Sequence, residues 1–249
     1  MERNTRSIDE AKALIFEMSR DQHALEETAD RLQGVRLRFQ TLDFGDTDYH
    51  LRGLRDVQQC PASVSELERF GISNATWPLF GVLWRSEELL SHLMLKEELG
   101  SKRILEVGCG LALASLVLKR RGADVTATDH HPVASEFLDF NTELNKIDRI
   151  SFKRVSWQAP DVSLGQFDLV VGSDLLYDQH NLDPLVSFLD SHVGHNGQIV
   201  MVDPGRGMAG KFTRLLQRLD FEVQTTSETY LSSDGESANY WVMRFSRVA

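Results

Sequence analysis

Short strand-like runs alternate with helix-forming stretches along residues 102–203. The strand-like runs are RILEVG, DVTATD, SFKRVSW, FDLVVGSD and QIVMVD, and the stretches between them include LALASLVLKRRG, VASEFLDFNTELNK and NLDPLVSFLDSHV. Strands of near-continuous hydrophobicity that alternate with helices are typical of a parallel sheet covered by helices on both faces. The pattern therefore predicts a doubly wound α/β fold.

The C-terminal residues break this alternation. A helix-forming stretch, KFTRLLQRLD, precedes two strand-like runs, FEVQTTSETYL and NYWVMRFSRV, which SSDGESA connects. The Asp-Gly pair in the connection is a turn signal for a β-hairpin. We therefore expect an antiparallel hairpin to close an otherwise parallel sheet.

The N-terminal residues predict an extension of this core. Residues 8–33 favour one or two amphipathic helices, which end at Gly34. Residues 35–54 alternate apolar and polar positions around Gly45-Asp46 and predict two strands joined by a turn. No Gly/Ser/Pro-rich linker follows, so residues 1–75 are expected to form an accessory layer on a core domain of residues 76–249.

The segment that joins the extension to the core predicts one helix that begins at Trp77. Its apolar positions recur at helical spacing. They are Leu83, Leu89, Leu90, Leu93 and Met94.

Composition and charge narrow the function. The chain has 249 residues, of which 41% are hydrophobic and 26% charged, as in an ordinary globular protein. The 27 Lys and Arg against 37 Asp and Glu give a net charge of −10, which argues against a nucleic-acid partner. The charge suits a basic partner better, although an acidic excess more often serves solubility alone. Cys60 and Cys109 form no CxxC pair, which excludes a disulfide framework and indicates a reducing compartment.

Targeting signals are not evident in the sequence. The first twenty residues contain no apolar stretch long enough for a signal peptide, and the longest apolar runs, such as WPLFGVLW, are far shorter than the ~20 residues of a membrane span. We therefore expect a cytoplasmic protein without membrane contact. The oligomeric state stays open, and a monomer is compatible with the sequence.

A glycine-rich turn follows the first core strand. In open α/β sheets, ligands bind at the carboxyl ends of the strands, where Glu106, Gly108 and Gly110 lie in this chain. Glycines let a ligand approach the main chain, and the next helix offers free N–H groups. The nicotinamide motif G-x-G-x-x-G would need a third glycine where Leu113 stands, so a dinucleotide site is disfavoured.

An acidic residue ends the next strand. Asp129 follows Gly108 by 21 residues, the distance at which a carboxylate can bind the ribose hydroxyls of a nucleoside cofactor. His130 and His131 come next without a third ligand at diagnostic spacing, so no metal site is predicted and solvated loop or adenine-rim positions are favoured. Asn141 and Asn145 are expected to lie on a helix surface or to cap it.

Four motifs in this order resemble the class I, seven-β-strand methyltransferases that use S-adenosyl-L-methionine. They are LWRSEELLSHL with Trp84, TDHHP with Asp129, VSWQ with Trp157, and a D-x-x-Y box from Asp174 to Tyr177. The resemblance covers residues 77–249 and is greatest to the small protein-lysine N-methyltransferases, which include those acting on chaperones, calmodulin and electron-transfer flavoprotein. It implies a Rossmann-like, mostly parallel seven-stranded sheet whose last strand is reversed.

The resemblance also implies roles for individual residues. Those expected to bind S-adenosyl-L-methionine are Trp84, Glu106, Gly108, Cys109, Gly110, Asp129, Trp157 and Ser173. Asp174 is expected to position the lysine amine of a protein substrate, and Tyr177 to orient it or to shape the channel. Anchoring of the cofactor is the alternative role for Asp174. Ala112 replaces a third glycine of many relatives, which predicts a slightly altered loop.

Two other function classes stay open from the sequence. The same scaffold could carry a small-molecule N-methyltransferase, or a non-catalytic protein that binds the cofactor and a partner. Gly205 and Arg206 follow the fifth strand and indicate a substrate entrance by position alone.

Overall fold

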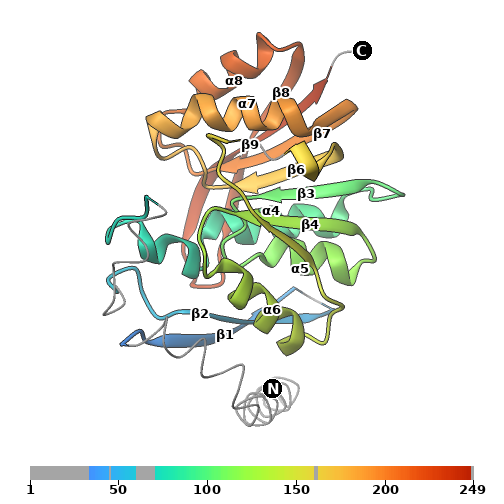
Figure 1. The fold of residues 1–249 in the computed structure, drawn as a ribbon. Helices are drawn as coiled ribbons and strands as arrows, with labels where there is room; N and C mark the ends of the chain where they lie inside the picture. The colour runs from blue at the N-terminus through green and yellow to red at the C-terminus, as the bar shows by residue number, and fades with distance from the viewer. Residues whose placement is uncertain (1–33, 45, 60–70, 160–161, 248–249) are drawn as a thin grey trace.

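The computed structural model describes residues 34–44, 46–59, 71–159 and 162–247 (Figure 1). The helices expected within residues 8–33, and Cys60, lie outside these ranges. A seven-stranded sheet has the order β5-β4-β3-β6-β7-β9-β8. Its strands are β3 (Arg103–Val107), β4 (Asp124–Asp129), β5 (Ser151–Arg154), β6 (Phe167–Ser173), β7 (Val193–Asp203), β8 (Phe221–Leu231) and β9 (Ser237–Arg247).

The predicted fold class is confirmed. Strands β3 to β7 pair in parallel, whereas β9 runs antiparallel to both of its neighbours, β7 and β8. The hairpin of β8 and β9 turns at residues 232–236, where Gly235 has a φ of +83°. This is the Asp-Gly turn that the sequence predicted.

Helices cover both faces of the sheet, as Figure 1 shows. Helices α4 (Arg85–Lys96) and α5 (Leu113–Arg120) pack on one face, and α7 (Leu182–His192) and α8 (Ala209–Gln217) pack on the other. Neighbouring residues of one strand enter opposite cores: Leu169 and Val171 belong to the first, and Val170 belongs to the second. Strands buried on both faces explain the continuous apolar runs of the sequence.

The other elements lie around this sandwich. They are β1 (Leu37–Asp43), β2 (Asp48–Leu54), α6 (Ala134–Leu144) and the 3₁₀ helices η1 (Trp77–Gly81), η2 (Val162–Leu164) and η3 (Gln179–Asn181). Within the described ranges, none of the helices combines the length and the apolar character needed to cross a bilayer.

The single helix predicted from Trp77 is divided. Residues 77–81 form η1, and α4 begins only at Arg85, after Val82 and Trp84 adopt extended backbone. Pro78 favours the start of η1, and Gly81 lies so close to the Leu54 side chain that a Cβ would overlap it. The break turns the Trp84 indole back toward η1, where Nε1 donates a hydrogen bond to the Leu79 carbonyl at 2.9 Å.

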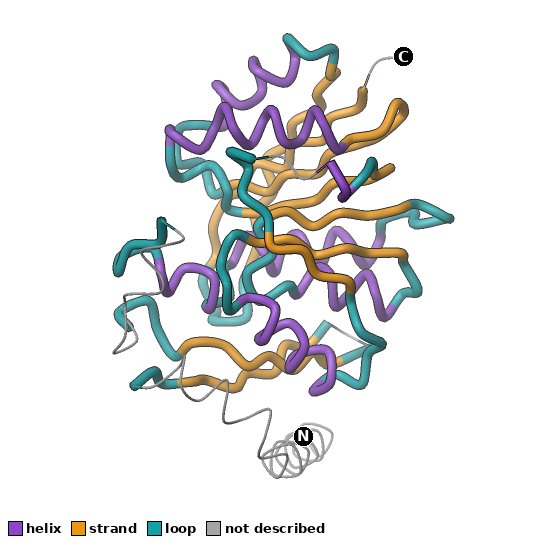
Figure 2. Tube along the Cα trace, viewed as in Figure 1, coloured by secondary structure: helices purple, strands orange, loops and turns teal. Residues whose placement is uncertain are grey.

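The predicted hairpin of β1 and β2 forms and lies beside α6 (Figure 2). Asn145 accepts a hydrogen bond from His50 N at 2.8 Å and donates to its carbonyl at 2.6 Å. Asn141 makes the same pair of contacts with Arg52, at 2.7 and 3.2 Å. Both asparagines are buried, so the surface position expected for them is wrong, and their amides pair with the edge strand β2 instead. The capping role is confirmed for Asn145, which is the C-cap residue of α6 and whose Nδ2 donates to the Asn141 carbonyl at 2.7 Å.

Candidate active site

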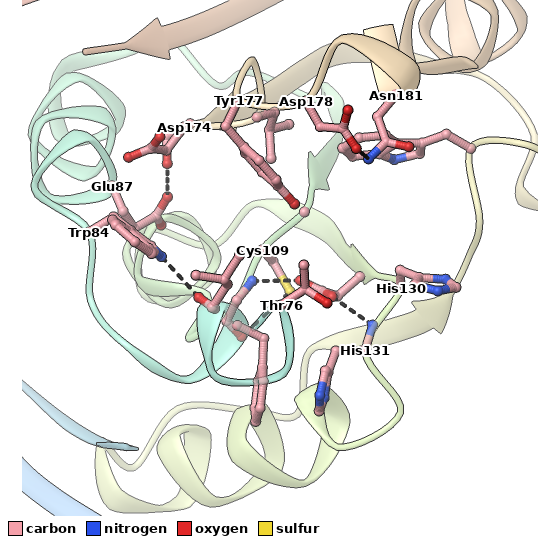
Figure 3. Close-up of a pocket in the computed structure, with 18 of the residues that line it drawn as sticks. Thr76, Trp84, Glu87, Cys109, His130, His131, Asp174, Tyr177, Asp178 and Asn181 are labelled. Carbon is pink, nitrogen blue, oxygen red and sulfur yellow. Dashed lines mark hydrogen bonds between the residues drawn. The ribbon is translucent and has the colours of Figure 1, made fainter. Parts of the chain in front are cut away.

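A cavity of about 490 Å³ opens at the carboxyl ends of β3, β4 and β6. The strand register brings these ends together: Val107 pairs with Thr128 of β4 and with Gly172 of β6. Figure 3 shows Glu87 and Asp174 on one side of the cavity, Asp178 and Asn181 on another, and the Tyr177 ring between them. The sheet topology therefore assembles the site that the motifs predicted one by one.

The glycine loop forms one wall of the cavity. Gly108 and Gly110 have φ values of +63° and +52°, which glycine adopts without strain. A Cβ on Gly110 would lie 2.9 Å from the carbonyl oxygen of Phe80, so η1 approaches the loop too closely for any side chain. Ala112 adopts the left-handed conformation, with φ 60° and ψ 38°. The chain thus keeps the backbone that a third glycine would favour, at the cost of strain in an alanine.

Asp129 supports this loop from the end of β4. Its Oδ2 accepts a hydrogen bond from Gly110 N at 2.9 Å, and its Oδ1 accepts one from His131 N at 2.8 Å. Burial raises the pKa of the Asp129 carboxyl, and the two N–H donors oppose this shift. Each carboxylate oxygen keeps a second lone pair, so Asp129 can still accept hydroxyl donors from a ligand.

Of the two positions expected for His131, the solvated loop position is wrong, because the side chain is buried, and the adenine-rim position stays a prediction. Its ring stacks on Phe80 with centroids 3.7 Å apart, and its Nδ1 accepts a hydrogen bond from Val133 N at 3.2 Å. Burial lowers the pKa of His131 to about 3, which keeps the imidazole neutral. The ring therefore shapes the cavity wall and carries no charge.

Two carboxyl groups lie beneath the loop, and the sequence motifs pointed to only one of them. Glu87 accepts hydrogen bonds from Ala114 N at 2.8 Å and from the Ser173 hydroxyl at 2.7 Å. Glu106 accepts from Ser115 N at 2.9 Å and is also a side-chain partner of Glu87. Burial raises the pKa of both groups, and the neighbouring Glu87 raises that of Glu106 further.

A proton shared by this pair explains its arrangement. Glu106 Oε1 is buried without a hydrogen-bond donor, and two adjacent carboxylates would repel each other. A protonated Glu106 that donates to Glu87 removes both costs. Glu106 therefore braces the helix that follows the loop and does not line the cavity, unlike the other predicted site residues.

Asp174 and Tyr177 of the D-x-x-Y box line another part of the cavity. Asp174 has a φ of +55°, and its Oδ2 accepts a hydrogen bond from the Ser86 hydroxyl at 3.1 Å. Burial raises the pKa of Asp174, and the adjacent Arg206 opposes this shift. Tyr177 is 45% exposed, and partial burial among carboxylates raises its pKa, so the phenol stays protonated.

Ser86, Glu87 and Arg206 are site residues that the sequence motifs did not assign. Glu87 could have been suspected, because it lies three residues before Leu90 and seven before Met94, both fully buried. An acid on the apolar stripe of a helix needs a buried partner. Arg206 gave no signal beyond its place after a strand.

Charge on the cavity wall favours cations. Of the described residues that line it, four are acidic and one is Lys or Arg. The acidic ones are Glu87, Asp129, Asp174 and Asp178, and the basic one is Arg206. Among the described residues, no group of three potential His, Cys, Asp or Glu ligands could hold a metal ion. The site therefore offers carboxylates and a loop backbone to a ligand.

The fold and the site are those of the class of Rossmann-like methyltransferases. The crystal structure of a ribosomal protein L11 methylase from Lactobacillus delbrueckii subsp. bulgaricus superposes with a TM-score of 0.55 at 23% identity, over 68% of this chain and 81% of that one. A family model described as lysine methyltransferase matches residues 66–218. The chain belongs to this lysine methyltransferase family.

Curated relatives carry related names. The electron transfer flavoprotein beta subunit lysine methyltransferase of Xenopus laevis is 28% identical over 66% of this chain and 65% of its own length. Protein N-lysine methyltransferase METTL21A of Mus musculus is 31% identical over 55% of this chain and 69% of its own. The chain spans between about half and two thirds of the length of most such relatives.

Proposed function

We propose that this chain transfers a methyl group from S-adenosylmethionine to the side-chain nitrogen of a lysine in a protein acceptor. The observation that carries the proposal is Asp174, a carboxylate at the end of β6 that faces an acid-lined cavity beside the glycine loop. Membership of the lysine methyltransferase family supports it, and so do relatives named as enzymes that act on protein lysines.

The residues present fit the cofactor. The loop of residues 108–110 lines the cavity, and Asp129 retains lone pairs for two ribose hydroxyls. Trp84 and Trp157 offer apolar walls, and the acidic lining suits a sulfonium and an α-ammonium group. When bound, S-adenosylmethionine would supply the methyl group on a positively charged sulfur.

In this proposal, the D-x-x-Y box binds and positions the acceptor amine. The pKa of a lysine side chain in water is about 10.4, so its ammonium must lose a proton before it attacks. Asp174 favours the ammonium and therefore acts by positioning, through charge-assisted hydrogen bonds, more than as a strong base. Tyr177, a protonated phenol at the cavity mouth, can hydrogen-bond the amine or its departing proton.

A labelling experiment tests the activity. The full chain is incubated with cell extract and S-adenosylmethionine labelled in its methyl group, and labelled proteins are identified by mass spectrometry. We expect label on lysine. Label confined to small molecules would favour a small-molecule N-methyltransferase, and cofactor binding without transfer to any acceptor would favour a non-catalytic binding protein.

Substitution of the carboxylate tests the mechanism. Asp174→Asn should lower kcat about 100-fold, because a misplaced nucleophile loses the advantage of orientation, while the Kd for S-adenosylmethionine changes less than about threefold. Asp178→Asn is the matched control, since it removes the same charge from another side of the same cavity. Equal activity of the two variants would contradict a positioning role for Asp174.

A further inference from the structure

Arg206 lies in the loop between β7 and α8 and covers the Asp174 carboxylate. Its Nη1 is 2.6 Å from Asp174 Oδ1, and its Nη2 donates to Oδ2 at 3.2 Å. Its guanidinium carbon also lies 5.6 Å from the centroid of the Trp84 ring. The one guanidinium among the described lining residues therefore rests on the carboxylate that an incoming cation would seek.

The two members of this ion pair differ in how firmly they are held. The Asp174 side chain is 9% exposed, its carboxylate accepts from the Ser86 hydroxyl, and its backbone N–H donates to the Val202 carbonyl at 2.9 Å. The Arg206 side chain is 42% exposed. Asp174 Oδ1 is buried and receives no well-aligned hydrogen bond despite the nearby Arg206. A better-aligned donor could therefore replace the guanidinium on a fixed carboxylate.

Two glycines flank Arg206 in its loop. Gly205 and Gly207 flank it with φ values of +87° and +91°, and a Cβ on Gly207 would meet nothing within 4 Å. Glycine has wide conformational freedom, so residues 205 and 207 can adjust when the Arg206 side chain moves, while the Arg206 backbone N–H is held by the Asp203 carboxylate. The start of the loop stays anchored, since Gly205 N donates to Asp203 Oδ1 at 2.7 Å.

We propose that the Arg206 guanidinium holds the place of the acceptor's ammonium group on Asp174, and that the acceptor displaces it on binding. The inference rests on the proposed function. Guanidinium and ammonium are both cations that donate hydrogen bonds to a carboxylate, so they compete for the same oxygens. While no acceptor is bound, Arg206 spares Asp174 an unpaired charge in a partly buried site. Because the acceptor must break the Arg206–Asp174 ion pair, its affinity is lower than it would be for an unpaired Asp174.

A small cation tests this competition without methyl transfer. Butylammonium chloride, which ends like a lysine side chain, is titrated into the full chain without cofactor, and binding is followed by calorimetry or NMR. Arg206→Gln should bind it about 3- to 10-fold more tightly than the unmodified chain. Arg85→Gln is the matched control, because Arg85 also pairs with an aspartate, is also 42% exposed and does not line the cavity.

The proposal requires that the tighter butylammonium binding of Arg206→Gln depends on Asp174. The gain should vanish in Arg206→Gln combined with Asp174→Asn, and Arg85→Gln should bind like the unmodified chain. A thermal melt checks that each variant folds. Arg206→Lys provides a second variant, in which an ammonium replaces the guanidinium and affinity should be intermediate. Equal affinity of the unmodified chain and both Arg206 variants, or a gain that survives the double substitution, would overturn the proposal.

The outcome is separable from that of the proposed function. If Arg206→Gln tightens butylammonium binding but the chain labels no lysine, the role proposed for Arg206 stands and the proposed lysine methyltransferase activity does not. If the chain labels lysine but Arg206→Gln leaves butylammonium affinity unchanged, the proposed activity stands and the role proposed for Arg206 does not. With an acceptor identified by labelling, Arg206→Gln should also lower its KM by a similar factor.

Discussion

Substitution of Gly110 by alanine tests why the loop of residues 108–110 needs a glycine at this position. Two costs add at Gly110. The residue has a φ of +52°, where an L-residue loses about 1–2 kcal/mol, and its new Cβ would lie 2.9 Å from the Phe80 carbonyl oxygen. Overpacking against a backbone atom that cannot rotate away costs typically about 1–3 kcal/mol. We expect Gly110→Ala to lower the free energy of unfolding by about 2–5 kcal/mol.

Gly100 supplies a matched control. It also has a φ of +52°, but a Cβ there would meet nothing within 4 Å. Gly100→Ala should therefore lose only the conformational part, about 1–2 kcal/mol. The difference between the two variants isolates the close approach of η1 to the loop.

Urea unfolding followed by tryptophan fluorescence gives both free energies, and calorimetry gives the Kd for S-adenosylmethionine. Gly110→Ala should weaken cofactor binding at least about tenfold, since the loop or η1 must move, which is about 1.4 kcal/mol. Gly100→Ala should bind like the unmodified chain. Equal losses of stability within about 0.5 kcal/mol would refute the role assigned to the Phe80 contact.

Three further predictions concern the buried groups of the site. Burial raises the pKa of Glu106, so the stability that this group contributes is lost as pH rises above about 4.3, its ordinary value. The thermal midpoint of Glu106→Gln, measured relative to that of the unmodified chain, should therefore rise between about pH 5 and about pH 8. A difference between the two midpoints that stays constant over this range would contradict the prediction. Asp129→Asn leaves one acceptor oxygen for two backbone N–H groups, and calorimetry should show cofactor affinity lowered at least about tenfold. Cys109 is buried with a raised pKa, so peptide mass spectrometry should find it alkylated by iodoacetamide far more slowly in native protein than in urea.

Much of the fold could be predicted because one periodicity repeats along the core. The central strands β3, β6 and β7 are apolar on both faces, and that pattern fits a sheet between two helical layers. The division of the helix at residues 77–96 does not follow from helical spacing, and Gly81, where η1 ends, packs closely against Leu54 of the hairpin. Helical spacing within one segment contains no information about such a distant contact.

The site divides in the same way. Gly108, Asp129 and Asp174 were predictable, because each stands at the end of a strand and parallel strands end at one edge of the sheet. The partners Ser86 and Arg206 were not, because they reach Asp174 from segments 88 and 32 residues away. Their roles arise from packing and not from any local motif.

The sequence by itself determined the layered α/β architecture, the reversed strand β9 and the strand ends where the chemistry would lie, since periodicity and turn chemistry are local properties of the chain. Only the tertiary structure decided the state of the charged groups. Glu106 became a carboxyl group with a raised pKa because the core buries it and α4 brings Glu87 against it, and Asp174 became a carboxylate covered by Arg206 because β7 ends beside β6. Charge interactions depend on distance and burial, which are set when the elements pack.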